Sequence, residues 1–236
     1  MAGRVEGVTF DFWNTLIAEG VNRSPRERRW AEMLAEFGFE VEQAAIEAAM
    51  GHVYSWFDEE WKANRVVSPA ALVERFLDDL GVSSPSVADM MLDALHSGLD
   101  PAIVTTAPGI GDTLEALRSS GVRLGIICDV GWTPSSTLRG YLDHHGLLAY
   151  FDGWSFSDEV GCYKPDPRIF GHARESLGID GPMAHVGDLR RTDVAGAMAV
   201  GWTAVRYSGL HDDKSERPDA DHVIAAHEEL SALLIG

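Results

Sequence analysis

The stretch Val8–Leu16, VTFDFWNTL, decides the fold of this chain. Its apolar start has β-strand character and brings the carboxylate of Asp11 to a turn, and Thr15 follows four residues later. A carboxylate presented at the end of a strand is a candidate nucleophile. Trp13, two residues after Asp11, adds a bulky aromatic side chain to the same turn.

Beyond this stretch, short apolar runs alternate with amphipathic helical segments, which is typical of a parallel sheet covered on both faces. The expected strands are residues 8–12, 123–128, 153–156, 183–186 and 203–207. Three of them lead to acidic residues, namely Asp11, Asp129 and, after Gly187, Asp188. Ligands of open α/β sheets bind beyond the carboxyl ends of the strands, so these carboxylates are expected to share one site.

Residues 18–105 contain no β-type run of any length and are expected to form a helical cap inserted into the core. Helices are predicted over residues 24–37, 41–62, 68–80 and 86–96. Ser24-Pro25 and Ser68-Pro69 are helix-start signals, with serine at the N-cap and proline at the first helical position. The α/β core is then residues 1–17 and 106–236, with a polar surface loop over residues 209–221.

The composition limits the possible partners. The 236 residues include 37 acidic and 19 basic ones, a formal charge of −18, which repels nucleic acid and anionic lipid surfaces. No stretch approaches the roughly 18 apolar residues of a membrane span. The start of the chain lacks the apolar segment of a secretory signal, and only Cys128 and Cys162 are cysteines, so a cytoplasmic protein is expected. Its expected state is a monomer or a homodimer. A site for a small anionic metabolite must therefore concentrate positive charge locally.

Four sequence motifs occur in order along the chain. They are Asp11 with Thr15; Cys128-Asp129; Lys164-Pro165; and Gly187-Asp188 with Asp193 five residues after Asp188. Together they resemble the haloacid dehalogenase-like hydrolase superfamily over nearly the full chain, in the form with a helical cap after the first strand. The chain also resembles actinobacterial-type members of this superfamily, with a non-acidic residue two positions after the nucleophile.

The resemblance implies a Rossmann-like core and a specific chemistry. Asp11 would attack phosphorus and form an aspartyl-phosphate, Thr15 would hold the nucleophile's loop by a hydrogen bond, and Lys164 would pair with Asp11 and the phosphoryl oxygens. The same resemblance implies a Mg²⁺ ion as cofactor. Its ligands would be Asp11, the backbone carbonyl of Trp13, Asp188, and Asp193 directly or through water.

The chain departs from the family pattern at three positions. Phosphatases of the family carry a second aspartate at the position of Trp13, and a positioned acid–base contributes roughly 10²- to 10⁴-fold. Cys128 stands where serine or threonine is usual, and a thiol is a poorer hydrogen-bond donor. Asp129, beside Asp11 and Asp188, is a candidate replacement for the missing acid–base, because neighbouring carboxylates raise a pKa. Cys128 and Asp129 are thus candidate catalytic residues.

The cap offers candidate substrate contacts at Arg23, Arg26 and Trp56. The arginines belong to a basic cluster at the start of the first cap helix, where the helix dipole disfavours cations. This cost favours anion recognition, as in dehalogenases, which carry a carboxylate-binding arginine in this part of the cap. The alternative is a solvated helix start, and Trp56 alternatively belongs to the cap core.

These observations favour a Mg²⁺-dependent hydrolase that acts through an aspartyl-phosphate on a small phosphorylated metabolite. Two alternatives stay open. The aromatic side chain of Trp13 favours a 2-haloacid dehalogenase-type hydrolase, a chemistry that needs no metal. A binding or regulatory module with weak catalysis would keep the fold and the metal without efficient turnover.

Overall fold

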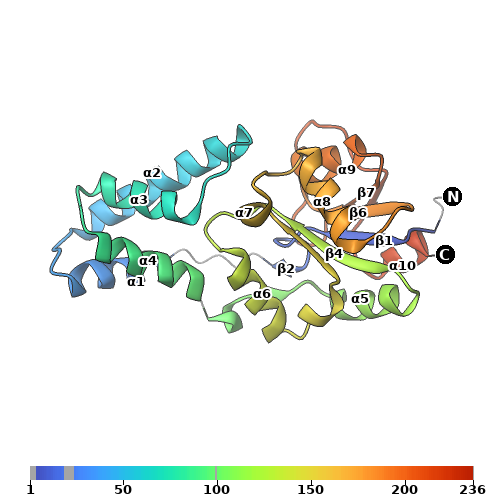
Figure 1. Ribbon diagram of the computed structural model, residues 1–236, viewed down its shortest axis with the longest axis horizontal. Coiled ribbons are helices and arrows are strands. Elements are labelled where there is room, and N and C mark those ends of the chain that lie inside the picture. The colour runs from blue at the N-terminus through green and yellow to red at the C-terminus, as the bar shows by residue number, and fades with distance from the viewer. Residues whose placement is uncertain (1–3, 19–23, 99, 236) are drawn as a thin grey trace.

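A parallel β-sheet forms the centre of the protein in the computed structural model (Figure 1). The structure describes residues 4–18, 24–98 and 100–235. Within these residues the six-stranded sheet has the order β5-β4-β1-β6-β7-β8, with every pair parallel. Its strands are β1 (Gly7–Phe10), β4 (Arg123–Cys128), β5 (Gly153–Phe156), β6 (Met183–Gly187), β7 (Thr203–Tyr207) and β8 (His222–Ile224). The predicted α/β, Rossmann-like fold is confirmed.

Strand β1 owes its apolar sequence to its central place in the sheet. It pairs with β4 on one side and β6 on the other, with Phe10 opposite Ile126 and Val186. All four of its residues are buried, as expected for a parallel strand covered on both faces. The order β4-β1-β6 brings the ends of these three strands, and the acidic residues that follow them, to one edge of the sheet.

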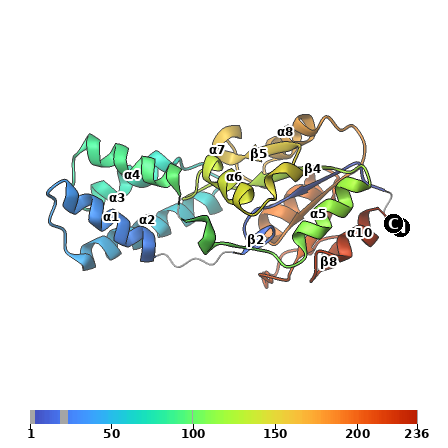
Figure 2. The ribbon, with the colours of Figure 1, turned by 90° about the horizontal axis from the view of Figure 1, so that it is seen from below.

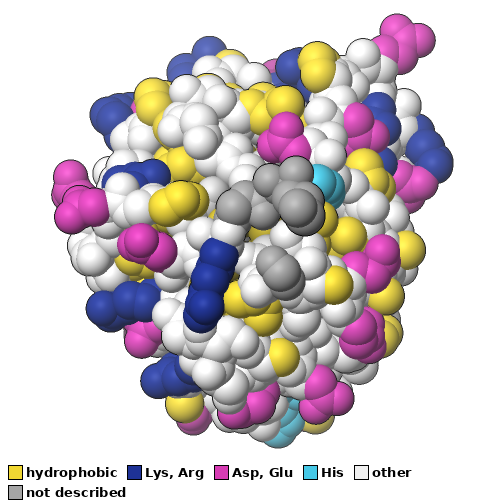
Figure 3. Space-filling model, turned by 90° about the vertical axis from the view of Figure 1, so that its right-hand side faces the viewer, with side chains coloured by type: hydrophobic (Ala, Val, Ile, Leu, Met, Phe, Trp, Pro, Cys, Tyr) yellow, Lys and Arg dark blue, Asp and Glu magenta, His cyan; other side chains and the backbone are white. Residues whose placement is uncertain are grey.

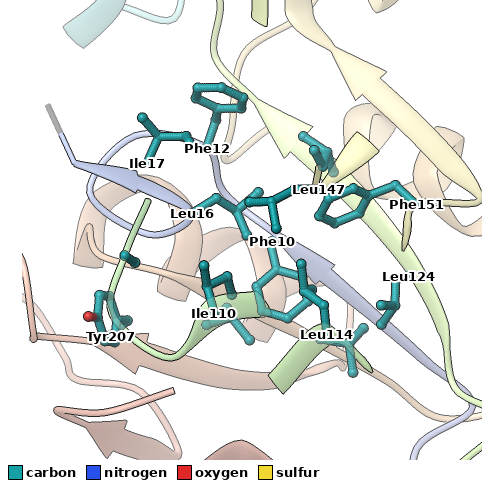
Figure 4. Packing of buried hydrophobic residues seen from close by; sticks show 14 of the residues in the cluster. Phe10, Phe12, Leu16, Ile17, Ile110, Leu114, Leu124, Leu147, Phe151 and Tyr207 are labelled. Carbon is teal, nitrogen blue, oxygen red and sulfur yellow. The ribbon is translucent and has the colours of Figure 1, made fainter. Parts of the chain in front are cut away.

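Helices cover both faces of the sheet (Figures 1 and 2). Helices α5 (Ile110–Ser119), α6 (Ser135–His144) and α10 (Glu229–Leu234) contribute to one hydrophobic cluster with β1 and β4. In Figure 4, Ile110 and Leu114 of α5 pack near Phe10 of β1. Helices α8 (Pro167–Leu177) and α9 (Ala195–Ala199) contribute to a second cluster, which includes Ile127 on the other face. Two separate clusters therefore hold the sheet between its helical layers.

Between β2 (Ile17–Ala18) and β3 (Thr105–Thr106), the described residues form four helices, a helical insertion with its own hydrophobic cluster. They lie to one side of the sheet in Figure 1. The helices are α1 (Ser24–Glu36), α2 (Gln43–Lys62), α3 (Pro69–Asp79) and α4 (Pro85–Ser97), followed by a short 3-10 turn, Pro101–Ile103. Ser68 caps α3 by accepting a hydrogen bond from Ala71 N at 3.2 Å, with Pro69 at the first position, as the sequence predicted.

Apart from shifts of one or two residues at the ends of elements, the strands differ from the sequence prediction in the following ways. Strand β1 ends at Phe10 because Phe12 already belongs to a turn, in which its carbonyl accepts hydrogen bonds from Leu16 N and Ile17 N. The insertion is bordered by the short antiparallel pair β2–β3, which was not predicted. Strand β8 was also missed, because it has only three residues and its middle residue, Val223, is exposed.

The end of the core away from the insertion carries a mixed surface (Figure 3). Lysine and arginine side chains are interspersed with aspartate and glutamate over this face, so its acidic residues do not form one uniform field. Among the helices that the structure describes, none combines the length and apolar character needed to cross a membrane.

Candidate active site

A tight turn after β1 presents Asp11. Asp11 N donates to Val186 O at 2.8 Å, which extends the β1–β6 ladder by one bond. Asn14 adopts a left-handed conformation with φ 55°, and its N–H closes the turn on Ile17 O at 2.7 Å. This backbone network fixes the nucleophile candidate at the edge of the sheet.

The resemblance implied that the Thr15 hydroxyl holds this turn by a hydrogen bond, but the described structure shows no such bond. Among the described residues its Oγ1 is buried without a hydrogen-bond partner. Its carbonyl oxygen instead lies 2.8 Å from His227 Nε2, and the His227 ring stacks on Tyr207 at 4.0 Å between centroids. Burial lowers the pKa of His227 to about 4, so the ring is neutral near pH 7 and donates its Nε2 proton to the turn. His227 had no signal in the sequence.

Lys164 joins the nucleophile candidate to the last acidic motif. It lies in the loop between α7 (Ser157–Val160) and α8, and only 2% of its side chain is exposed. Its Nζ donates to Asp11 Oδ1 at 2.5 Å and to Asp193 Oδ1 at 2.6 Å. Burial opposes the ammonium charge, but Asp11 and Asp193 more than compensate and hold the pKa of Lys164 well above its usual range. Lys164 therefore remains charged in the site.

Both carboxylate oxygens of Asp193 have hydrogen-bond partners within the protein. It lies in the π-helical turn η3 (Arg190–Val194). Besides the bond from Lys164, Oδ1 lies 3.0 Å from His185 Nε2, and Oδ2 accepts from Leu189 N at 3.0 Å and Thr192 Oγ1 at 3.2 Å. Burial alone would raise its pKa, but Lys164 and His185 hold it well below the usual range. With these partners, Asp193 is better placed to orient Lys164 than to bind a cation alone.

His185 lies in β6, next to Val186. It is fully buried and bridges Asp193 to Thr9, whose Oγ1 lies 2.9 Å from His185 Nδ1. Burial, the largest cause, lowers the pKa of His185 although Asp193 opposes the shift. A neutral imidazole thus links the β1–β6 pair to the carboxylates.

Asp11, Asp188 and Asp193 form a buried group whose carboxylate oxygens lie within 4.8 Å of one another. Burial raises the pKa of Asp11 to about 7 and that of Asp188 to about 9, with further upward contributions from neighbouring carboxylates. One lysine cannot balance three carboxylates, so the metal-free site tends to hold protons. The donor set fits a hard divalent cation such as Mg²⁺, which prefers carboxylate oxygens.

Asp188 has a further partner that the sequence did not reveal. His211 Nδ1 lies 2.6 Å from Asp188 Oδ2. The His211 side chain is 45% exposed, whereas that of Asp188 is 4% exposed. His211 thus lies between the carboxylate group and solvent, in the region that the sequence predicted as a polar surface loop.

The side chain of Trp13 packs among aromatic residues. Its ring lies 5.1 Å from Phe12 and 6.4 Å from Tyr141 of α6, both edge-to-face. It is partly buried against the hydrophobic cluster of the core. Indole has no proton to exchange near neutral pH, so this turn supplies no acid–base from Trp13. The role of its backbone carbonyl as a metal ligand stays a prediction.

Cys128 and Asp129, at the end of β4, differ in their surroundings. Cys128 is buried, and burial raises the pKa of its thiol well above the usual value, so it is not a reactive thiolate. Asp129 is held by two N–H groups: Oδ1 accepts from Lys164 N at 2.8 Å and Oδ2 from Trp61 Nε1 at 2.9 Å. Burial raises the pKa of Asp129 despite these bonds. A raised pKa suits a general acid, whereas the two bonds favour the carboxylate.

Trp61 is one of several contacts between the insertion and the edge of the site. Val67 N, between α2 and α3, donates to Tyr163 Oη at 3.2 Å, and Tyr163 Oη donates to Val130 O at 3.3 Å. Trp132, in the loop after β4, packs into the hydrophobic cluster of the insertion. Its ring lies 4.6 Å from that of Tyr54. The loop that follows Asp129 is therefore part of the packing of the insertion.

Trp56 is the one predicted substrate contact of the cap whose side chain the structure describes. Arg23 and the side chain of Arg26 lie outside the described residues. Trp56 packs against the cluster of the insertion, and the Arg75 guanidinium lies 5.7 Å from its ring centroid. The alternative interpretation of Trp56, as a core residue of the insertion, fits this packing.

A cavity of about 490 Å³ lies where the insertion meets the loop after β4. Its lining includes Arg29 and Trp30 of α1, Asp93 of α4, and Trp132 and Tyr141 of the core. Tyr141 also contacts the ring of Trp13, so the cavity and the turn of Asp11 share a neighbour.

Comparison with known proteins supports this arrangement. The family model described as haloacid dehalogenase-like hydrolase matches residues 5–201. The chain belongs to the haloacid dehalogenase-like hydrolases. Relatives of this hydrolase include haloacid dehalogenase-like hydrolase domain-containing protein 3 of Mus musculus, 27% identical over 212 residues, which are 86% of this chain and 81% of that protein.

Relatives of this hydrolase differ in their named activities. A pyrimidine 5'-nucleotidase of Escherichia coli (strain K12), YjjG, is 28% identical over 163 residues, 68% of each chain. The solved structure of a HAD phosphatase from Thermococcus onnurineus has a TM-score of 0.70 and 26% identity and covers 98% of this chain and 99% of its own. The relatives also include a glyceraldehyde 3-phosphate phosphatase and an (S)-2-haloacid dehalogenase. Family membership thus establishes a hydrolase without fixing its substrate.

Proposed function

We propose that this hydrolase removes the phosphoryl group from a small phosphorylated metabolite through an aspartyl-phosphate on Asp11. The observation that carries the proposal is the buried group of Asp11, Asp188 and Asp193 with Lys164 bridging two of its members. This arrangement gathers cation ligands and a fixed ammonium group around one carboxylate. It fits phosphoryl transfer, in which negative charge must be balanced at the reacting centre.

The chain's own residues account for the two steps. A carboxylate oxygen of Asp11 forms a bond to phosphorus while the bond to the leaving oxygen breaks, and water then attacks the aspartyl-phosphate and regenerates Asp11. Lys164 favours the ionised form of Asp11 against the effect of burial and would stabilise the phosphoryl oxygens. Asp193, itself fixed by His185 and two N–H or O–H donors, keeps the Lys164 ammonium group in place.

Mg²⁺ held by Asp11 and Asp188, with Asp193 nearby, would offset the repulsion between carboxylate and phosphate when bound. Trp13 offers no proton for the leaving oxygen, and Asp129 is the candidate that could supply one. Substrates whose leaving groups depart without protonation, such as acyl phosphates, should therefore react faster than alkyl phosphates.

We infer that the helical insertion acts as a cap. Its contacts with Asp129, Tyr163 and the loop after β4 support this role, because they border the site. A cap in this position would exclude water and select the substrate.

The test is phosphate release from a panel of acyl and alkyl phosphates, with Mg²⁺ and with chelator, for the wild type and Asp11→Asn. Release that needs both Mg²⁺ and Asp11 is expected, and acyl phosphates should rank first. Equal rates on the two classes would contradict the inferred effect of Trp13. Binding of ligands without turnover would favour a regulatory module.

A dehalogenase is the second candidate, because the aromatic ring of Trp13 replaces an acid in the turn after Asp11. The buried carboxylate group argues against it, since that chemistry uses no metal. Halide release from a 2-haloacid that persists in chelator, with no phosphate release from the panel, would favour this candidate over the phosphohydrolase.

A further inference from the structure

Arg191 connects the carboxylate site to the helical insertion. It lies in the turn η3, between Asp188 and Asp193 in the sequence. Its guanidinium carbon is 3.8 Å from the ring centroid of Trp61, and Nη1 donates to Asn64 Oδ1 at 3.2 Å. Trp61 in turn donates to Asp129 at 2.9 Å, and Asp129 accepts from Lys164 N. A short chain of contacts thus leads from Arg191 to the residue that holds Asp11.

One donor of Arg191 lacks a partner. In the part of the chain that the structure describes, Nη2 is buried and makes no hydrogen bond. Leaving a buried donor unpaired is unfavourable, and more so for a charged group. In the neighbouring Arg190, Nη1 donates to Ser215 O and Nη2 to Asp219 Oδ2 at 2.7 Å, although its Nε is also unpaired. Both outer nitrogens of Arg190 therefore have hydrogen-bond partners within the protein, whereas Nη2 of Arg191 has none among the described residues.

Arg191 also differs from Lys164 in its ion pairs. Lys164 is bound to Asp11 and Asp193, and no carboxylate lies in ion-pair contact with Arg191 among the described residues. Burial, the largest cause, lowers the pKa of Arg191, while Asp129 and Asp193 oppose this effect. An arginine nevertheless stays protonated in proteins. In a strongly acidic chain, it is a cation available to an anionic ligand at the edge of the site.

We propose that Arg191 binds a carboxylate of the substrate while the phosphoryl group lies at Asp11. The ring of Trp61 packs against the flat face of the Arg191 guanidinium group and so fixes its plane. A planar carboxylate can then bind in that plane, along the edge of the guanidinium group. The substrate class is thus a small phosphorylated carboxylic acid. The inference rests on the proposed phosphohydrolase function, and it makes Arg191 the residue that determines specificity.

The experiment compares two non-hydrolysable probes by calorimetry with the Mg²⁺-loaded full chain. Phosphonoacetate carries a carboxylate that methylphosphonate lacks, so the ratio of their affinities reports the carboxylate alone. The wild type should bind phosphonoacetate at least about tenfold more tightly, because a hydrogen bond to a charged group has this order of effect. Arg191→Gln should abolish the preference and leave methylphosphonate binding unchanged.

Arg190→Gln is the matched control, since it removes a charge from the same turn but should keep the preference. Arg191→Lys should keep part of it, and thermal unfolding shows whether each variant is folded. Equal affinity of the wild type for both probes, or equal weakening of both by Arg191→Gln, would overturn the inference and leave the proposed function standing. If the wild type bound neither probe, the proposed function would fall, and the inference with it.

Discussion

The indole N–H of Trp61 donates to Asp129 Oδ2 at 2.9 Å and thereby ties α2 of the insertion to the end of β4. The other oxygen of Asp129 accepts from Lys164 N at 2.8 Å. Asp129 is therefore both a neighbour of the nucleophile's lysine and an attachment point for the insertion. Its two possible roles, acid–base and docking, predict different effects of mutation.

Asp129→Asn removes any proton transfer but keeps an oxygen that can accept one N–H. If Asp129 serves as the acid–base, kcat should fall by roughly 10²- to 10⁴-fold, with loss of one limb of the pH–rate profile. Trp61→Phe keeps an aromatic side chain but removes the N–H that bonds to Asp129 and reduces the ring surface beneath Arg191, so it should raise KM more than it lowers kcat. Steady-state kinetics across pH on an acyl phosphate measure both effects. Turnover by Asp129→Asn at the wild-type rate would rule out the acid–base role.

Mg²⁺ should stabilise the protein more at pH 9 than at pH 6. In the metal-free fold Asp11 and Asp188 have pKa values of about 7 and about 9, above the ordinary value of about 4. Groups with raised pKa contribute stability that is lost as pH rises through those values, so the metal-free protein should lose stability between pH 6 and pH 9. Mg²⁺ replaces the bound protons, and each tenfold gain in affinity adds about 1.4 kcal/mol of stabilisation at saturating metal.

Thermal unfolding with and without Mg²⁺ at each pH measures this linkage. Calorimetry in buffers of different ionisation enthalpy should also show protons released on binding. Asp188→Asn is the control, because it removes the more strongly shifted carboxylate. A Mg²⁺-induced rise in Tm that did not depend on pH would contradict the prediction.

Gly187→Ala should disturb the site without changing its charge. A Cβ on Gly187 would lie 2.3 Å from Asp193 Cγ and 2.7 Å from its Oδ1, so Asp193 must shift and lose its alignment with Lys164. Overpacking of this kind costs about 1–3 kcal/mol. We expect a loss of kcat of at least about tenfold, on the scale of one displaced charged hydrogen bond.

Gly171→Ala, in the middle of α8, is the control for Gly187→Ala, because no atom lies within 4 Å of its added Cβ. It should leave kcat unchanged and stabilise the fold by about 0.5–1 kcal/mol through helix propensity. Wild-type kcat in Gly187→Ala would show that the position of Asp193 does not matter for turnover.

Much of the core was predictable because its strands are buried apolar runs between turn signals. The strands at residues 123–128, 153–156 and 203–207 have the predicted bounds. Strand β8 could not be predicted in this way, since an exposed Val223 and only three residues give no alternation to detect. The length of β1 was overestimated because Phe12 is apolar although it lies in a turn.

The acidic motifs lie close together because they follow neighbouring parallel strands, an arrangement that the sequence pattern predicted. Strands β1 and β6 are neighbours, so Asp11 and Asp188, which follow them, must lie close together. The contacts of Trp61, Arg191 and His185 were not predictable. They depend on side-chain directions and, for Trp61 and Asp129, on a pairing across 68 residues that no local pattern records.

Gly131→Ala tests how closely the insertion must approach the core. A Cβ at this position would lie 2.4 Å from Phe57 Cζ of α2, so the Phe57 ring must turn aside, or the insertion must move relative to the loop after β4. The displacement should weaken the nearby Trp61–Asp129 bond, raise KM several-fold and increase hydrogen exchange in α2. Gly140→Ala, with open space at its Cβ in α6, should change neither property. Adding Phe57→Ala to Gly131→Ala removes the clash and should restore part of the lost affinity. An unchanged KM in Gly131→Ala would show that contact between Phe57 and this loop is not needed for substrate binding.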